Sequence, residues 1–572
     1  MITNLLARSR SALRGQAFAL VLAAGVGLFL LLFLLLPVLS VVLTAFRAAD
    51  GSFTLVHFAD FFRTSLFRES FFNSFYVAAM SVVWATLIAV PLAYLLARFR
   101  FPGASLIQAL GVIPLVMPPF VGAVAMQLIF GRNGSVNLLL NDWFGFRIGF
   151  MDGLNGVVFV EALHYFPFIL LNLTAALNNI DNAMEEAAQN LGAHGFTLFR
   201  RIVFPLALPG YVAGASLVFV KVFDDLGTPL LLSVTNMLAP QAYLRITSVG
   251  MGDPMGYVIA VILVGFSLAA MALSALALRG KDYSTQQRGG GGLGRRQLSK
   301  PQMALAWGFI ILVLLVALSP HLGILLLSLG TIWSFSVLPD AFTLAHYATA
   351  WQESSAQIGN TVLYCGLAAL IDLVLGTAIA WLILRSKLPA RQLLDHIATA
   401  ALAVPGLVLG IGLLRLYFEV KLPDGSSLAT FWGMLVIAYA IRRLPYALRA
   451  CMAALQQLHV SLEEAAEMLG AGKLTTLRRI VVPLMTGGLA AAFVTSFATA
   501  SVELSATLML VTRDVSAPIS YGIYTAMQTP AGRGPGAALG IIAVLLVALG
   551  TWASHRIAER DRARRGLRSA DQ

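Results

Sequence analysis

Charged residues are scarce in this chain. Only 12% of its 572 residues are Asp, Glu, Lys or Arg, whereas 58% are hydrophobic. Soluble domains carry about 25% charged residues. The composition therefore excludes an ordinary soluble protein and indicates an integral membrane protein.

Cysteine is also nearly absent, and recognisable catalytic patterns are missing. Cys365 and Cys451 are the two cysteines, and both fall in apolar segments, so they predict no disulfide framework. The eight histidines show no metal-ligand spacing, and no nucleophile motif is present. We therefore expect no catalytic residue, no metal site and no cofactor in this chain, which argues against an enzyme.

Long apolar runs are what the sequence has instead. A spanning helix needs roughly 20 apolar residues. Twelve segments meet this length: about 17–46, 72–97, 104–130, 153–178, 205–233, 257–278, 304–332, 358–384, 391–417, 427–452, 483–511 and 536–555. The first is too long for a signal peptide and is expected to be retained as a span. We predict an all-α polytopic membrane protein with about twelve transmembrane helices.

Basic residues predict the orientation of these spans. With a cytoplasmic N-terminus, 25 of the 39 Lys and Arg residues fall in cytoplasmic segments, nine fall in outer loops and five fall within spans. Lys and Arg are enriched on the cytoplasmic side of membrane proteins. We expect both termini in the cytoplasm, and we assign the net charge of +12 to membrane orientation and not to nucleic-acid binding.

A duplication organises the chain. Residues 185–210 and 463–488 align without a gap at an offset of 278, with 15 of 26 positions identical. Each copy lies within a set of six apparent spans, so the halves should form a parallel repeat about a pseudo-two-fold axis along the membrane normal. We predict two six-span domains at 1–278 and 303–572, joined by a cytoplasmic linker at 279–302 that contains four consecutive glycines.

Each copy reads as a short polar helix, a turn and the start of a span. Asn182 and Ser461 each precede a glutamate by three residues, a spacing that suits a reciprocal N-terminal cap. Glycine at 192 and 470 should end the helix in a left-handed turn. Pro205 and Pro483 then open the following apolar runs, because the first turn of a helix tolerates proline.

These two loops resemble the signature loop of binding-protein-dependent ABC importer permeases. The family pattern is Glu-Ala-Ala, three residues, Gly, nine residues, Ile, two residues and Pro. It is filled by Glu186, Ala187, Ala188, Gly192, Ile202 and Pro205 in loop 185–205, and by Glu464, Ala465, Ala466, Gly470, Ile480 and Pro483 in loop 463–483. Phe204 and Val482 replace the usual Leu before the proline.

The resemblance implies two fused permease domains of the type I importer class. It also implies partners: two copies of a cytoplasmic ATP-binding subunit that carry ATP and Mg, and a periplasmic or lipid-anchored solute-binding protein. The coupling residues would be Glu185, Glu186, Ala187, Ala188, Gly192, Glu463, Glu464, Ala465, Ala466 and Gly470. Residues 469–476, LGAGKLTT, do not form a phosphate-binding loop, since Leu474 follows Gly472-Lys473.

Ionisable residues within spans are costly and mark either pathways or internal ion pairs. The candidates for the translocation pathway are Glu161, His164, Lys221, Asp224, Asp225, Arg442, Arg443 and Glu503. Asp225 and Glu503 occupy equivalent positions in the two halves, and prolines and glycines nearby indicate broken helices. A purely structural salt-bridge network remains the alternative.

The segments DDLGTP at 224–229 and ELSATL at 503–508 are most similar to those of ferric iron permeases. Ferric iron is therefore the expected substrate, and the expected location is the bacterial inner membrane. Relatives of the same group import 2-aminoethylphosphonate, thiamine, polyamines, sulfate or molybdate, so these substrates stay open. A secondary transporter without an ATPase is the remaining alternative.

Overall fold

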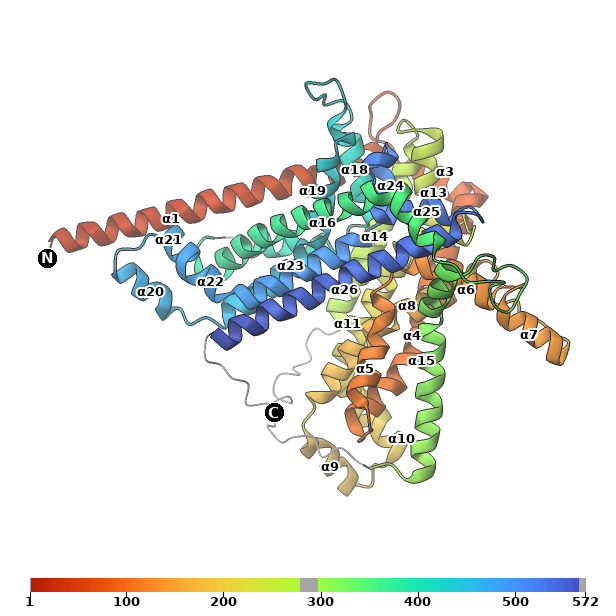
Figure 1. The fold of residues 1–572 in the computed structure, drawn as a ribbon. Coiled ribbons are helices and arrows are strands. Elements are labelled where there is room, and N and C mark those ends of the chain that lie inside the picture. Colours follow the sequence, from red (N-terminus) through yellow and green to blue (C-terminus); the bar gives the residue numbers. More distant parts are fainter. Residues whose placement is uncertain (1, 278–296, 390, 565–572) are drawn as a thin grey trace. The chain divides into compact units, whose positions relative to one another are not determined.

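The computed structural model describes residues 2–277, 297–389 and 391–564, and this part of the chain is almost entirely helical (Figure 1). Within it we find isolated β-bridges but no strand. The predicted all-α polytopic fold is confirmed. Most of the linker predicted at 279–302 lies outside the described residues.

The chain divides into two compact units. Unit 1 comprises Met1–Thr54, Trp351–Gly522 and Ile542–Gln572, and unit 2 comprises Leu55–Ala350 and Ile523–Ile541. In unit 2, α4 packs against α8 and α11, and α11 also packs against α14. These helices are α4 (Ser65–Arg98), α8 (Leu154–Asn178), α11 (Phe204–Phe223) and α14 (Pro254–Ala277).

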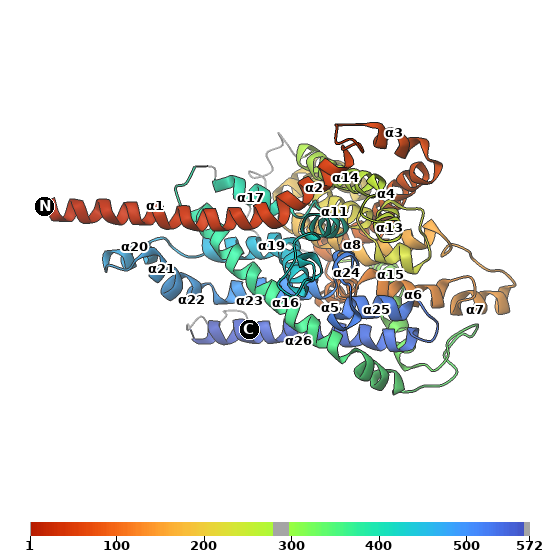
Figure 2. The same ribbon diagram turned by 90° about the horizontal axis from the view of Figure 1, so that it is seen from above.

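Unit 1 is built mainly from the second half of the sequence. In it α19 packs against α23, and α18 packs against α2 and α24 (Figures 1 and 2). The elements are α2 (Leu36–Ala45), α16 (Ala345–Arg385), α18 (Gly406–Tyr417), α19 (Trp432–Gln456), α23 (Thr486–Ser501) and α24 (Ser505–Leu510). Both α8 and α19 have 25 residues and lie 278 positions apart.

The units do not coincide with the halves of the sequence, because the first span of each half packs with the other half. In unit 1, α1 (Ile2–Leu30) and α2 belong with α18, and the hydroxyl of Tyr417 donates to the carbonyl oxygen of Leu32 at 2.9 Å. In unit 2, α15 (Lys300–Leu329) packs against α6 (Pro119–Phe130). A Cβ on Gly323 of α15 would lie 2.8 Å from the Cβ of Ala125, so this packing needs glycine.

Eight helices among the described residues are long and apolar enough to span a membrane, and two further bent pairs bring the number to ten. The remaining two of the twelve predicted segments have physical reasons for failing this test. The segment at 391–417 is broken before Gly406, and its intact part, α18, has only 12 residues. The helix α19 carries three arginines along an otherwise apolar sequence.

The third span is broken in each half at an equivalent proline. In the first half, α5 (Ala104–Val112) and a short 3₁₀ turn precede Pro118 and α6, and the segments Ala104–Leu115 and Pro119–Phe144 meet at a bend of 99°. In the second half, α17 (Arg391–Ala400) precedes Pro405 and α18. A proline removes a backbone donor and disfavours helical geometry in the residue before it, which explains the break.

The exchange of first spans generates a prediction about independent folding. Residues 1–280 expressed alone should be unstable, because they lack α15, and residues 297–572 alone should lack α1 and α2. Expressed together as two chains, the fragments should assemble and co-purify. We expect at least tenfold more folded protein by size-exclusion chromatography from the pair than from either fragment. A fragment that is stable alone would contradict the exchange.

Candidate functional site

The two signature loops, 185–205 and 463–483, fold in the same way. We call them docking loops, and the first helix of each its docking helix, after the role that the resemblance implies. In the first, α9 (Asn182–Asn190) leads through α10 (Gly195–Leu198) into a π-helical turn and α11. In the second, α20 (Ser461–Met468) leads through α21 (Lys473–Thr476) and another π-helical turn into α22 (Val482–Leu484) and α23. Pro205 and Pro483 stand in the first turns of α11 and α22, as predicted.

The predicted glycine turns are present with the expected geometry. Gly192 and Gly470 have φ values of +87° and +86°. The amide of Ala193 donates to the carbonyl of Ala188 at 2.9 Å, and the amide of Gly192 donates to that of Gln189 at 2.9 Å. In the second loop, the amide of Ala471 donates to the carbonyl of Ala466 and the amide of Gly470 to that of Glu467, both at 3.0 Å. This is the Schellman arrangement, which satisfies the last carbonyls of a helix.

The predicted N-terminal caps are wrong. The first docking helix is capped by Asp181, whose carboxylate accepts from the amide of Ala183 at 2.9 Å. The second begins after Val460, without a side-chain cap, and Ser461 instead bonds to the ring of His459 at 2.8 Å. The sequence favoured the wrong residue because Asp181 and Asn182 are both good cap residues and only one fits the backbone.

The two consecutive glutamates of each loop have different surroundings. Glu185 and Glu463 are 5% and 6% exposed, whereas Glu186 and Glu464 are exposed. Glu185 forms an ion pair with Arg98 at 2.6 Å, and Glu463 forms one with Arg385, also at 2.6 Å. The glutamate of the family pattern therefore faces outward in both loops, and the residue before it faces inward.

Each docking helix also presents an apolar side chain to its surroundings. Leu191 and Leu469, at equivalent positions, are 89% and 90% exposed, and Met468 is 83% exposed. Exposed apolar groups clustered on a helix end typically mark a contact surface for another protein. Figure 1 shows α9 at one end of unit 2 and α20 at one end of unit 1, where each is accessible.

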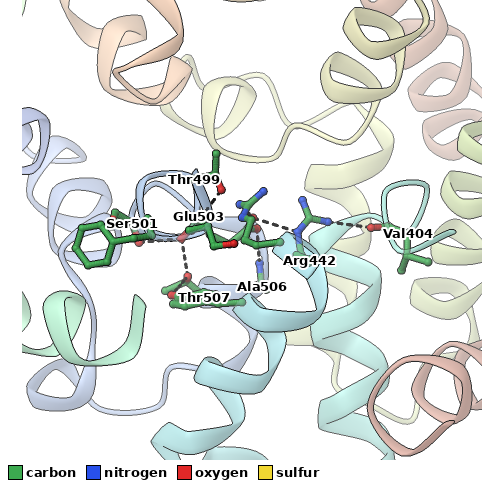
Figure 3. Close-up of polar contacts among 12 residues, drawn as sticks. Val404, Arg442, Thr499, Ser501, Glu503, Ala506 and Thr507 are labelled. Atoms are coloured by element: carbon green, nitrogen blue, oxygen red, sulfur yellow. Dashed lines mark hydrogen bonds and ion pairs between the residues drawn. The ribbon is translucent and has the colours of Figure 1, made fainter. Parts of the chain in front are cut away.

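The in-span arginines of unit 1 form an ion cluster with Glu503 (Figure 3). Nε of Arg442 lies 3.1 Å from a carboxylate oxygen of Glu503, and Arg443 contacts the same oxygen. The other end of the Arg442 guanidinium donates to the carbonyl oxygen of Val404 at 2.9 Å, in the break of the third span. A Cβ on Gly406 would lie 2.6 Å from Glu503, so the cluster also requires glycine there.

Asp225 of unit 2 is the equivalent of Glu503, at the break of the fifth span, but has a different environment. It lies between α11 and α12 (Gly227–Leu231), and its carboxylate accepts from the amide of Thr228 at 2.9 Å. Glu503 faces the amide of Ala506 in the same way, at 3.5 Å. Each acid thus caps the short helix that follows it, where the helix dipole favours negative charge. Glu161 of α8 is fully buried beside Asp225. The position equivalent to Arg442 in this half is His164, which is not an arginine.

The other predicted pathway residues lie near these breaks. His164 of α8 and His321 of α15 line a cavity of about 20 Å³ in unit 2, next to Pro114 and Pro118, which is room for about one water. Lys221 lies in the last turn of α11, and Asp224 follows that helix and is 8% exposed. Among the described residues no three His, Cys, Asp or Glu side chains gather as a metal site.

Sequence reasoning missed three charged residues. Arg98 and Arg385, the last residues of α4 and α16, hold the inner glutamates of the docking helices. Asp372 of α16 is fully buried, in the same unit as Arg442 and Arg443. An ionisable residue in an apolar run was the available signal for Asp372. For the two arginines, the signal was their equivalent place at the ends of matching spans.

Comparison with known proteins gives the family. The model for "Binding-protein-dependent transport system inner membrane component" matches residues 89–283 and again residues 372–562. The chain therefore belongs to this family as a fused, two-domain permease. The two matches cover the two copies of the signature loop and most of the spans.

Two relatives that align with most of this chain are named as ferric transport permeases. The ferric transport system permease protein FbpB of Actinobacillus pleuropneumoniae is 27% identical over 464 residues, which are 79% of this chain and 65% of that protein. This chain thus aligns with just under two thirds of that relative. The putative ferric transport system permease protein FbpB 1 of Haemophilus influenzae is 26% identical, over 88% of this chain and 79% of its own length.

A shorter relative is a molybdenum permease. The molybdenum transport system permease protein ModB of Haemophilus influenzae is 38% identical over 154 residues, which are 27% of this chain and 66% of that protein. Together the relatives support the prediction of a transport subunit that is not an enzyme.

The turn at Gly192 generates a test of the first docking loop. A β-branched residue is strained at positive φ, and a left-handed conformation costs about 1–2 kcal/mol for residues other than glycine. We expect Gly192→Val to loosen α9, measured as faster amide exchange across 183–190, without loss of membrane insertion. Gly192→Asn is the control, because Asn tolerates this region. No space is filled by either change, since a Cβ at 192 meets no atom within 4 Å. Equal exchange in Gly192→Val and wild type would contradict the assignment.

Proposed function

We propose that this chain is the membrane subunit of an ATP-driven importer in the bacterial inner membrane. Two copies of a separate ATP-binding subunit, which carry ATP and Mg, dock on the two loops, and a periplasmic or lipid-anchored binding protein delivers the solute. The observation that carries the proposal is the pair of equivalent docking helices. Each has an outward glutamate and an exposed leucine, and a duplicated contact surface suits two copies of one partner.

Orientation follows from the same parts of the chain. The basic residues favour a cytoplasmic N-terminus with both docking loops on the same side. In unit 1, α1 packs against α21. Figures 1 and 2 show that the start of α1 and the end of α26 (Arg533–Arg564) lie at the same end as α20. These positions support placing the two termini and the second loop together in the cytoplasm.

Ferric iron is the substrate that we propose. The two long relatives carry this activity in their names, and Glu161 and Asp225 offer carboxylate oxygens, which are hard ligands suited to a hard cation. Import of an oxyanion is the second candidate, favoured by the molybdenum relative and by Arg442 and Arg443. These arginines are already engaged by Glu503, which makes iron the better choice.

The test of the proposal uses the permease purified with its ATP-binding subunit and reconstituted in vesicles with the binding protein. Uptake of radioactive ferric iron should require ATP, and molybdate uptake should be at background. Molybdate uptake without iron uptake would establish the second candidate. Uptake of either solute without ATP would indicate a secondary transporter.

Docking is tested at the exposed leucines. Leu191→Glu and Leu469→Glu place a charge where an apolar contact is expected, so binding of the ATP-binding subunit should weaken at least tenfold for the double variant. Val515→Glu is the matched control, because Val515 is 78% exposed and lies outside both loops. We would measure binding by co-purification and by titration in detergent. Unchanged binding in the double variant would refute the docking surface.

The in-span acids should respond differently to neutralisation. Glu503→Gln leaves two buried arginines short of one carboxylate, and removing one partner of a buried ion pair costs about 3–5 kcal/mol. We expect this variant to lose thermal stability together with uptake. Asp225→Asn keeps an oxygen for the Thr228 amide, so it should stay stable while uptake falls. The exposed Asp514→Asn is the control for both. Equal losses of stability at Asp225 and Glu503 would assign both to structure.

A further inference from the structure

The same buried ion pair occurs at both docking helices. Arg98 and Glu185 have side chains only 5% and 7% exposed, and the side chains of Arg385 and Glu463 are 11% and 8% exposed. The arginines are equivalent at an offset of 287 and the glutamates at 278, so the pair follows the repeat. Both pairs join the end of a second span to a helix about 80 residues later in the chain.

In unit 1 the arginine also binds a third element. The guanidinium of Arg385 donates to the carbonyl oxygens of Leu458 at 2.8 Å and Leu455 at 3.1 Å, at the C-terminal end of α19, and its Nε donates to Glu463. Leu455 lies in the last turn of α19 and Leu458 lies two residues beyond it, where the negative end of the helix dipole favours a cation. One guanidinium therefore ties together α16, α19 and α20.

Burial makes these links stronger than ordinary surface salt bridges. An exposed pair contributes about 0–1 kcal/mol because water screens it. A buried charge that loses its partner has no such screening, so the pair resists separation. The planar fork of arginine adds direction, since it binds a carboxylate and backbone oxygens at the same time.

We propose that Arg98 and Arg385 are positioning residues that fasten each docking helix to the end of a second span. Through them, a displacement of the docking helix by the ATP-binding subunit is passed to α4 and α16, continuous helices of 34 and 41 residues. The two consecutive glutamates of each loop have different roles. Glu185 and Glu463 form ion pairs with the arginines, while Glu186 and Glu464 face the ATP-binding subunit. This inference rests on the proposed docking function.

The chain supplies matched controls for a test. Arg100 and Lys387 lie two residues beyond Arg98 and Arg385, are exposed, and are themselves equivalent in the repeat. We would compare Arg98→Gln with Arg100→Gln, and Arg385→Gln with Lys387→Gln. The exchange variant Arg98→Glu with Glu185→Arg tests whether the pair itself matters, because it restores opposite charges with the positions reversed.

The first measurement is amide exchange in the purified full-length permease, which needs no partner. Arg98→Gln should raise exchange in α9, and Arg385→Gln should raise it in α20, at least tenfold over the matched controls. The double variant Arg98→Glu with Glu185→Arg should recover part of the protection of α9 against amide exchange. Wild-type exchange in both glutamine variants would overturn the proposal, whether or not the chain transports anything.

The second measurement uses the reconstituted complex of permease, ATP-binding subunit and binding protein. With wild type active, Arg98→Gln should keep its affinity for the ATP-binding subunit and continue to hydrolyse ATP, while uptake per ATP falls at least fivefold. Loss of ATP-binding-subunit affinity in that variant, at the level of Leu191→Glu, would show that Arg98 acts in docking and would overturn its role as a transmitter. Absence of ATP-dependent uptake in wild type would instead refute the proposed function itself.

Discussion

Compensation of buried charge is the constraint on which much of this structure depends. The chain is 58% hydrophobic, and each charge within its apolar segments must find a partner or water. The buried arginines we describe meet this requirement by joining elements distant in sequence. Arg442 connects the break of the third span to Glu503 at the end of the fifth, and Arg385 connects α16 and α19 to the docking helix α20. Ion pairs therefore connect helix ends that are distant in sequence, in addition to the apolar packing between the helices.

The helical architecture could be read from the sequence because its signals are local or periodic. Apolar runs predict spans, Gly192 and Gly470 predict turns with positive φ, and the offset of 278 predicts that α8 and α19 have matching lengths. The exchange of first spans between the units could not be read in this way. Nothing local distinguishes a first span that packs on its own half from one that packs on the other, because both bury the same kind of apolar surface.

The candidate site was only partly predictable for a related reason. Glu185 and Glu186 are adjacent and chemically alike, and helical geometry alone decides that one faces Arg98 and the other faces outward. The arginines themselves look like ordinary basic residues at the end of a span, where Lys and Arg are common. Their burial becomes visible only when α9 and α20 are placed against the ends of α4 and α16.

The two halves have equivalent helices but differ in the charged residues near the break of the fifth span. Asp225 and Glu503 both sit at the break before a short helix and face its first amides, so the duplicated role of these acids is to hold that helix start. In unit 1, Arg442 and Arg443 both pair with Glu503. In unit 2, the positions of the two arginines hold His164 and Tyr165, and the position of Tyr439 holds Glu161, which adds an acid beside Asp225. A balanced cluster stabilises a fixed geometry, whereas neighbouring carboxyl groups favour the approach of a proton or a cation. The asymmetry therefore makes the break in unit 2 the better candidate for contact with a positively charged solute.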